Sequence, residues 1–361
     1  MEKTAIKELY HQAVELLRQM IAIPSFSKEE DQVSQLLTDF LSARGVSVQK
    51  HQLNLWTGNK YYDPLKPTLL LNSHFDTVKP NSGYTRDPFL PQIEEGKLFG
   101  LGSNDAGGCL VSLIATFLYF KDREDLSFNL VLAAVAEEEI SGKNGTESLL
   151  SVIGKVDCAI VGEPTLMQMA VAEKGLLVID FTARGKSGHA ARNEGENAIT
   201  KAIRDINWLN NYQFEKVSPL LGPVRLSVTQ INAGTQHNVI PDTCSFVADI
   251  RLNELYTHEE VLELLQANLK SEIAPRSTRI KSSAISESHP LVQSGLLLGK
   301  EMYGSPTTSD KALMPFPALK MGPGDSARSH TADEFIYLNE IEDGIETYTR
   351  LLEQFNQLKL A

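Results

Sequence analysis

The hydrophobic pattern near the amino terminus has helical spacing. Apolar side chains recur at steps of three and four over residues 6–20, which predicts an amphipathic helix that Pro24 ends. The same spacing over residues 33–41 predicts a second helix, opened by a capping box that begins at Ser27 and ended by Gly45. We interpret both helices as scaffold.

Other apolar positions form short uninterrupted runs, as strands buried on both faces of a parallel sheet do. The clearest are Leu69–Leu71 and residues 128–135. We expect strands at residues 46–53, 68–72, 128–135 and 156–161, a strand and turn at 318–324, and helices at residues 109–115, 290–303 and 339–358. Helices that alternate with buried strands are typical of an α/β domain.

From Gly175 the pattern changes to a β-α-β-β-α-β series of about a hundred residues. Its elements are expected at residues 176–183, 195–211, 224–231, 243–251, 258–269 and 278–282. That order suits a small α+β module, of ferredoxin-like order, inserted into the scaffold. We therefore predict two domains, one formed by residues 1–174 plus 287–361 and one by residues 175–286.

Polar side chains that can bind metals stand where several of the buried strands end. The first strand leads to His74 and Asp76, and the strand at 128–135 leads to Glu137, Glu138 and Glu139. Three adjacent carboxylates at the end of a buried strand are costly unless a cation or a proton neutralises them. Because open α/β sheets keep their sites at the carboxyl ends of strands, we expect such side chains to gather there. The candidate metal ligands are His74, Asp105, Glu139, Glu163 and His330.

Two histidines and three carboxylates, one of them bridging, suit a pair of zinc ions about 3.5–4 Å apart with a water between them. We then expect Asp76 to accept a hydrogen bond from the second ring N–H of His74 and so to orient the ring. Glu138 is adjacent to a ligand but free of the metal, and it is placed to take a proton from the water. The glycine-rich loop at 100–108 lacks a phosphate-binding ending, so it favours a cation over a phosphate.

Composition limits the alternatives. A hydrophobic content of 42% and a charged content of 22% are typical of a globular protein, and the longest apolar runs are too short to span a membrane. The net charge of −12, without a basic cluster, argues against nucleic acid as a partner. The three scattered cysteines and an amino terminus unlike a signal peptide favour a cytoplasmic protein.

The ordered motifs resemble those of the M20 metallopeptidases, specifically the branch of acetylornithine deacetylase and succinyl-diaminopimelate desuccinylase. They cover essentially the whole chain: His74-x-Asp76, Asp105-x-Gly107-Gly108, Glu138-Glu139, Gly162-Glu163-Pro164, Gly185-x-x-Gly188-His189 and His330-x-x-Asp333-Glu334. One departure concerns the bridging aspartate, around which the branch often has Arg, Met and Lys where this chain has Leu101, Ala106 and Gly107.

The resemblance implies an α/β fold, in which a mixed-sheet zinc-peptidase-like catalytic domain carries an inserted α+β lid and dimerisation domain. It implies that His74 and Glu163 hold one zinc, that Glu139 and His330 hold the other, and that Asp105 bridges them. Cobalt is a possible substitute for zinc. Glu138 is the implied general base, and a cis peptide bond is implied after Asp105.

The resemblance also assigns roles outside the metal ligands. A histidine that matches His189 reaches the partner subunit's site in a homodimer and stabilises the oxyanion. Asn238 and Arg251 match residues that contact the substrate carboxylate, and Arg328 is a further candidate for that role. Taken alone, His189 would be a turn residue and Arg251 a member of a surface ion pair.

We therefore expect a cytoplasmic, homodimeric, two-zinc amidohydrolase that removes an acetyl or succinyl group from an amino acid of arginine biosynthesis, such as N-acyl-ornithine or N-acyl-citrulline. The alternative within the same fold is desuccinylation of a diaminopimelate or hydrolysis of a dipeptide. The alternative from another class is a metal-binding homologue without catalytic activity.

Overall fold

The computed structural model describes residues 2–192 and 194–358, and the chain divides into two compact units. Unit 1 comprises Met1–Val171, Ile285–Tyr303 and Ser309–Ala361, and unit 2 comprises Ala172–Ala284 and Gly304–Thr308. The catalytic role expected for residues 1–174 plus 287–361 and the lid role expected for residues 175–286 stay predictions.

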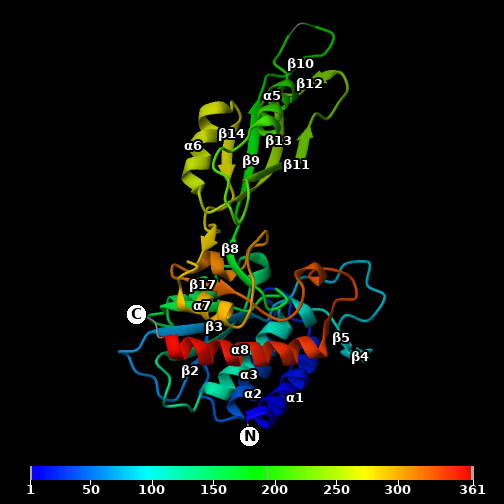
Figure 1. The fold of residues 1–361 in the computed structure, drawn as a ribbon. Helices are drawn as coiled ribbons and strands as arrows, with labels where there is room; N and C mark the ends of the chain where they lie inside the picture. Colours follow the sequence, from blue (N-terminus) through cyan, green and yellow to red (C-terminus); the bar gives the residue numbers. More distant parts are fainter. Residues whose placement is uncertain (1, 193, 359–361) are drawn as a thin grey trace. The chain divides into compact units, whose positions relative to one another are not determined.

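Unit 1 contains a mixed sheet with the strand order β1-β2-β6-β3-β7-β17-β8, of which Figure 1 labels β2, β3, β17 and β8. The neighbours β6, β3, β7 and β17 run parallel, and the strands outside them pair antiparallel. The strands are β1 (Gln49–His51), β2 (Asn54–Gly58), β3 (Thr68–His74), β6 (Asn129–Val135), β7 (Cys158–Val161), β8 (Met169–Glu173) and β17 (Ala318–Lys320). The predicted mixed α/β fold is confirmed.

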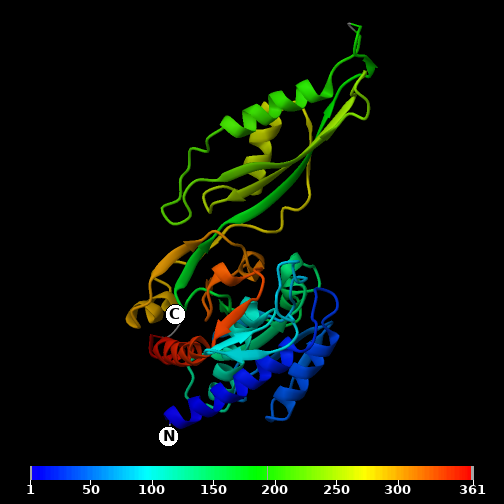
Figure 2. The same cartoon turned by 90° about the vertical axis from the view of Figure 1, so that its right-hand side faces the viewer.

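Strand β3 is buried on both faces because its leucines alternate between two apolar clusters. Leu69 and Leu71 belong to the cluster that includes the helices, and Leu70 belongs to the cluster on the other face. The helices of unit 1 are α1 (Glu2–Ile21), α2 (Asp31–Ser42), α3 (Gly108–Phe120), α4 (Thr146–Leu150), α7 (Pro290–Leu297) and α8 (Leu338–Leu358). Figure 2 shows α1 and α2, in blue, side by side.

A small sheet of order β18-β5-β4 lies beside the sequence that carries Asp105. Its strands are β4 (Gln92–Glu94), β5 (Lys97–Phe99) and β18 (Phe335–Tyr337). Strand β5 leads into the irregular turn η1 (Ser103–Gly107), in which Asp105 and Ala106 have non-helical backbone angles, and α3 follows. This sheet ties the carboxyl-terminal part of unit 1 to the loop of the candidate bridging ligand.

Unit 2 has a four-stranded antiparallel sheet of order β11-β13-β9-β14, with two helices packed on it. Its core includes the stacked rings of Phe181 and Phe246, with centroids 4.7 Å apart. The elements are β9 (Gly175–Arg184), β10 (Gly188–His189), α5 (Ala198–Asn211), β11 (Arg225–Ala233), β12 (Val239–Ile240), β13 (Thr243–Leu252), α6 (His258–Asn268), β14 (Glu272–Pro275) and β15 (Ser283–Ala284). Strand β16 (Met302–Ser305) begins in unit 1 and ends in unit 2.

Several predicted elements differ from the structure. The last strand of the four-stranded sheet is β14 (Glu272–Pro275), whereas residues 278–282 form no strand and precede the two-residue strand β15. The predicted helix at 290–303 ends at Leu297, and β16 follows. Ser27 does not cap α2, because the helix begins at Asp31 with Glu30 as its N-cap residue; the Ser27 hydroxyl donates to Asp76. In the described part of the chain, no helix is long and apolar enough to cross a membrane.

Candidate metal centre

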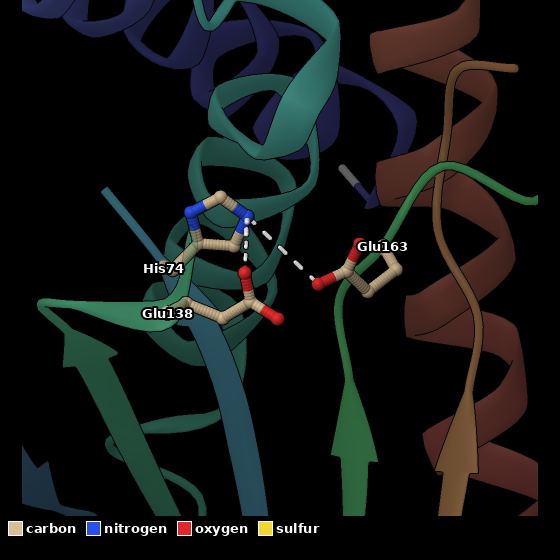
Figure 3. Close-up of side chains that lie close together, drawn as sticks. All are labelled: His74, Glu138 and Glu163. Atoms are coloured by element: carbon tan, nitrogen blue, oxygen red, sulfur yellow. Dashed lines mark ion pairs between the residues drawn. The ribbon is translucent and has the colours of Figure 1, made fainter. Parts of the chain in front are cut away.

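The predicted ligands from the sheet lie at one edge because their strands are adjacent and parallel. His74 is the last residue of β3, which pairs with β6 on one side and β7 on the other. Glu138 and Glu139 begin the short helix η2 (Glu138–Ile140) after β6, and Glu163 follows β7. Figure 3 shows one ring nitrogen of His74 facing the carboxylates of Glu138 and Glu163.

His74 Nε2 is buried and, among the described residues, has no hydrogen-bond partner. It lies 3.4 Å from Asp105 Oδ1, 3.8 Å from Glu163 Oε1 and 4.0 Å from Glu138 Oε2. The other ring nitrogen, Nδ1, lies 3.0 Å from the carbonyl oxygen of Asp76, which can only accept, so Nδ1 carries the hydrogen. Nε2 then faces three carboxylates, an arrangement that requires either a proton on Nε2 or a metal cation.

Asp105 faces both histidines through different oxygens. Its Oδ1 lies near His74, and its Oδ2 lies 3.6 Å from His330 Nε2. His330 Nε2 is also 3.0 Å from Glu139 Oε2. The structure therefore brings all five predicted ligands together and puts Asp105 between two histidines, as a bridging carboxylate requires.

The loop that carries Asp105 is closely packed. The peptide bond between Asp105 and Ala106 is cis, as the resemblance implied. A Cβ atom on Gly107 would lie 2.4 Å from the carbonyl oxygen of Gly102, so the turn requires glycine there. Asp105 is thereby held on a short, glycine-dependent turn at the start of α3.

Asp76 organises the neighbouring loop as well as His74. Its Oδ1 lies 3.4 Å from His74 Nδ1 and accepts a hydrogen bond from the Glu138 N–H at 3.0 Å. Its Oδ2 accepts from the Glu139 N–H at 3.1 Å and from the Ser27 hydroxyl at 2.7 Å. This buried carboxylate therefore supports the segment that presents Glu138 and Glu139.

The pKa values of His74 and Glu138 are shifted by burial and by the carboxylates around them. Burial alone would lower the pKa of His74, but the carboxylates of Asp105 and Asp76 hold it well above its usual value. Burial raises the pKa of Glu138 well above its usual value, and the nearby charge of Glu163 adds to this effect. A bound cation would replace the proton in this charge balance.

The donor set fits divalent metal ions. Two groups in the described part of the chain bring their ligand atoms within 4.8 Å of one another: His74 with Glu138 and Glu163, and His74 with Asp105 and Glu139. Imidazole and carboxylate groups are ligands that zinc and cobalt accept. The unpartnered Nε2 atom of His74 marks where such an ion would bind.

Two predicted substrate contacts already have carboxylate partners. Arg328 forms a bidentate pair with Glu340, with distances of 2.9 and 2.6 Å. Arg251 pairs in the same way with Asp249 on β13, at 2.7 and 3.0 Å. The structure thus places Arg328 in unit 1 and Arg251 in unit 2, each in an ion pair.

His189 and Asn238 lie close together in unit 2. His189 pairs with Val239 across the ribbon formed by β10 and β12, and the Ala190 N–H donates to the Asn238 carbonyl oxygen. His189 Nδ1 accepts from the Ala191 N–H at 3.1 Å, so neutral His189 carries its hydrogen on Nε2. Both residues are exposed.

Three residues around the centre were not predicted from the sequence. Buried Asp310 accepts from Asn72 and Thr146, and burial raises its pKa to about 6. Asn104 pairs with the Asp325 backbone in both directions, at 3.0 Å each. Glu334 belongs to a recognised motif but was given no role. Burial and the nearby charge of Asp105 raise its pKa to about 8. Asn104 was signalled only by its position next to Asp105 and Glu334 only by its place in a motif, whereas Asp310 is adjacent to no predicted ligand or motif.

A mixed α/β unit with histidine and carboxylate ligands at its strand ends defines a metal-binding hydrolase of the peptidase type. The sequence matches the family described as "Peptidase family M20/M25/M40" over residues 70–354, and the chain belongs to that family. Its members hydrolyse amide bonds, so the predicted family and enzyme class are confirmed.

Curated relatives match almost the whole chain. An acetylornithine deacetylase from Proteus mirabilis is 30% identical, covering 95% of this chain and 96% of the relative. A succinyl-diaminopimelate desuccinylase from Cereibacter sphaeroides is 26% identical, with coverages of 95% and 98%. Among solved structures, a Bacillus subtilis protein described as a dinuclear metal-binding peptidase of the M20 family has a TM-score of 0.72 at 15% identity, covering 96% of this chain and 98% of that one. This structural likeness shows the fold.

Proposed function

We propose that the protein is a two-metal amidohydrolase that removes an N-acetyl or N-succinyl group from an amino acid of arginine biosynthesis, such as N-acyl-ornithine or N-acyl-citrulline. The observation that carries the proposal is the position of Asp105 between His74 and His330, with Glu139 and Glu163 beside them. The acetylornithine deacetylase at 30% identity supports the substrate class.

The proposed ligand assignment is His74 and Glu163 for one ion, Glu139 and His330 for the other, and Asp105 for both. Bound zinc, or cobalt in its place, would polarise the acyl carbonyl and make the attacking water more acidic. Glu138 accepts the proton of that water and returns it to the leaving amine.

Glu138 has two candidate roles, because its Oε2 is about as far from His74 Nε2 as the nearest Glu163 oxygen is. Replacing it by glutamine separates them. A general base predicts that Glu138→Gln retains its metal and loses roughly 10²–10⁴-fold in kcat. Loss of metal with loss of activity would make Glu138 a ligand, and nearly unchanged kcat with intact metal would refute the mechanism.

The identity of the substrate needs a direct comparison. The assay offers acetyl- and succinyl-ornithine, acetyl- and succinyl-citrulline, succinyl-diaminopimelate and several dipeptides under identical zinc and cobalt conditions. A preference for succinyl-diaminopimelate or a dipeptide would favour the alternatives within the fold, the first of which the desuccinylase relative supports. Retained metal without hydrolysis of any compound would favour a non-catalytic homologue.

We also propose a homodimer formed through unit 2, in which His189 stabilises the oxyanion in the partner's site. Supporting features are the exposed edge strand β11, where Ile231 is 51% exposed, and the hydrogen on Nε2 that makes His189 a donor. Asn238, Arg251 and Arg328 remain the proposed contacts of the substrate carboxylate. Three buried, unbridged cysteines support a cytoplasmic location. Sedimentation equilibrium would test the dimer.

A further inference from the structure

We propose that Glu334 is a positioning residue that fixes the candidate bridging ligand Asp105 relative to His330. The inference rests on the two-metal function proposed above, in which these two residues are ligands. It concerns a motif residue to which neither the sequence nor the reaction had given a role.

The side chain of Glu334 holds two consecutive peptide groups. It is 2% exposed, and its Oε1 accepts from the N–H of Asn104 at 2.8 Å and from the N–H of Asp105 at 2.9 Å. Two N–H groups directed at one fixed oxygen set the orientation of both peptide planes. They therefore set the direction in which the Asp105 side chain leaves the backbone.

The backbone of Glu334 is fixed to the same loop. Its carbonyl oxygen accepts from the Gly100 N–H at 3.0 Å, and the next residue, Phe335, pairs with Phe99 between β18 and β5. Strand β5 runs into the turn that carries Asp105. Because Glu334 lies four residues after His330, the segment between them connects one candidate ligand directly to the support of the other.

The preceding residue, Asp333, makes comparable contacts with a different loop. Its Oδ1 accepts from the Thr85 N–H at 2.9 Å and from the Arg86 N–H at 3.0 Å. That loop carries no candidate metal ligand. Asp333 therefore provides a matched control, an adjacent carboxylate that also binds two backbone N–H groups but does not orient Asp105.

The test uses the full chain and three variants: Glu334→Ala, Glu334→Gln and Asp333→Ala. Cobalt is titrated into the metal-free protein against a competing chelator, with the visible absorption spectrum of bound cobalt as a second readout and thermal unfolding as a check of folding. We expect Glu334→Ala to weaken binding of one of two cobalt ions by roughly 10–100-fold and to change its spectrum.

Glu334→Gln should restore most of the affinity, because the amide oxygen can accept both N–H groups where the carboxylate did. Asp333→Ala should weaken metal affinity by less than Glu334→Ala does, because the loop at Thr85 and Arg86 that it holds carries no candidate metal ligand. With a substrate, Glu334→Ala should lower kcat more than it changes KM.

Two results would overturn the inference: two cobalt ions bound to Glu334→Ala with wild-type affinity and spectrum, or a folded Glu334→Gln variant as weak as Glu334→Ala. If Glu334→Ala does not fold, Glu334→Asp takes its place, since it keeps the charge but withdraws the oxygen by one methylene, and wild-type binding in that variant overturns the inference. A wild-type protein that takes up no metal would refute the proposed function itself, and the role of Glu334 with it.

Discussion

Replacing Asp76 by alanine removes a carboxylate that contacts both His74 and the Glu138–Glu139 segment. Asp76→Ala leaves the N–H groups of Glu138 and Glu139 without their acceptor, and it takes away the ion pair at His74 Nδ1. The carbonyl oxygen of residue 76 remains 3.0 Å from Nδ1, so the hydrogen stays on Nδ1. The damage should therefore fall mainly on the positions of Glu138 and Glu139.

The magnitude follows from these contacts. A buried N–H that loses its partner costs about 1–3 kcal/mol, so two of them cost about 2–6 kcal/mol. Loss of an outer support of a metal site weakens metal affinity by roughly 10–100-fold, or about 1.4–2.7 kcal/mol. We expect Asp76→Ala to show that loss of metal affinity. The rest of the cost of the two unpaired N–H groups should appear as a lower free energy of unfolding.

The assay is a zinc competition titration with a chromogenic chelator, together with urea unfolding and kcat on the preferred acyl amino acid. Ser27→Ala is the matched control, because it removes a single hydrogen bond to Asp76 and leaves both N–H contacts in place. The control should change metal affinity by less than about fivefold. Folded Asp76→Ala protein with wild-type zinc affinity and kcat would refute the reasoning.

Three further predictions concern separate parts of the chain. Gly107→Ala places a Cβ 2.4 Å from the carbonyl oxygen of Gly102 and should lower the free energy of unfolding by about 1–3 kcal/mol in urea titrations, whereas an unchanged midpoint would contradict the packing. Burial alone would raise the pKa of Asp205, but hydrogen bonds from Ser271 and Arg204 lower it. The ionised Asp205 therefore stabilises the folded state fully above the unfolded pKa of about 3.9, and this stabilisation is lost as pH falls through the lower folded pKa. Asp205→Asn should therefore cost about 2 kcal/mol at pH 7, and its difference from wild type should shrink below about pH 4. Chelation should abolish hydrolysis and lower the melting temperature, with both restored by zinc; a melting temperature indifferent to chelator would contradict the metal centre.

The sheet-borne part of the candidate site could be predicted because it depends on simple rules. Leu69–Leu71 marks a buried strand, and parallel neighbours end at the same edge, so His74, Glu139 and Glu163 converge without knowledge of any loop. Asp105 and His330 followed from the donor types needed, not from periodicity. Their contact depends on loop conformations, including a positive φ of 60° at His330, that hydrophobic patterns do not encode.

The errors at element ends have a similar cause. Ser27 has the sequence of a capping box, but α2 begins only at Asp31, and the Ser27 hydroxyl donates to Asp76, a buried carboxylate distant in the chain. The strand predicted at residues 278–282 was misplaced because the position of β14 is decided by its pairing with β9. The apolar pattern near residue 280 fits an extended segment without strand pairing equally well. Tertiary contacts that no local rule contains decided both cases.

The division of the chain has a consequence for how unit 2 is attached. The polypeptide passes between the units at residues 171/172, 284/285, 303/304 and 308/309. A protease that cuts one of these crossings leaves unit 2 covalently joined to unit 1 by the others. Excision of residues 172–284 would leave behind Gly304–Thr308, which include the end of β16. The excised piece would include the end of β8, the strand with which β16 pairs. Exchanging this unit between relatives therefore requires two segments to be transplanted together.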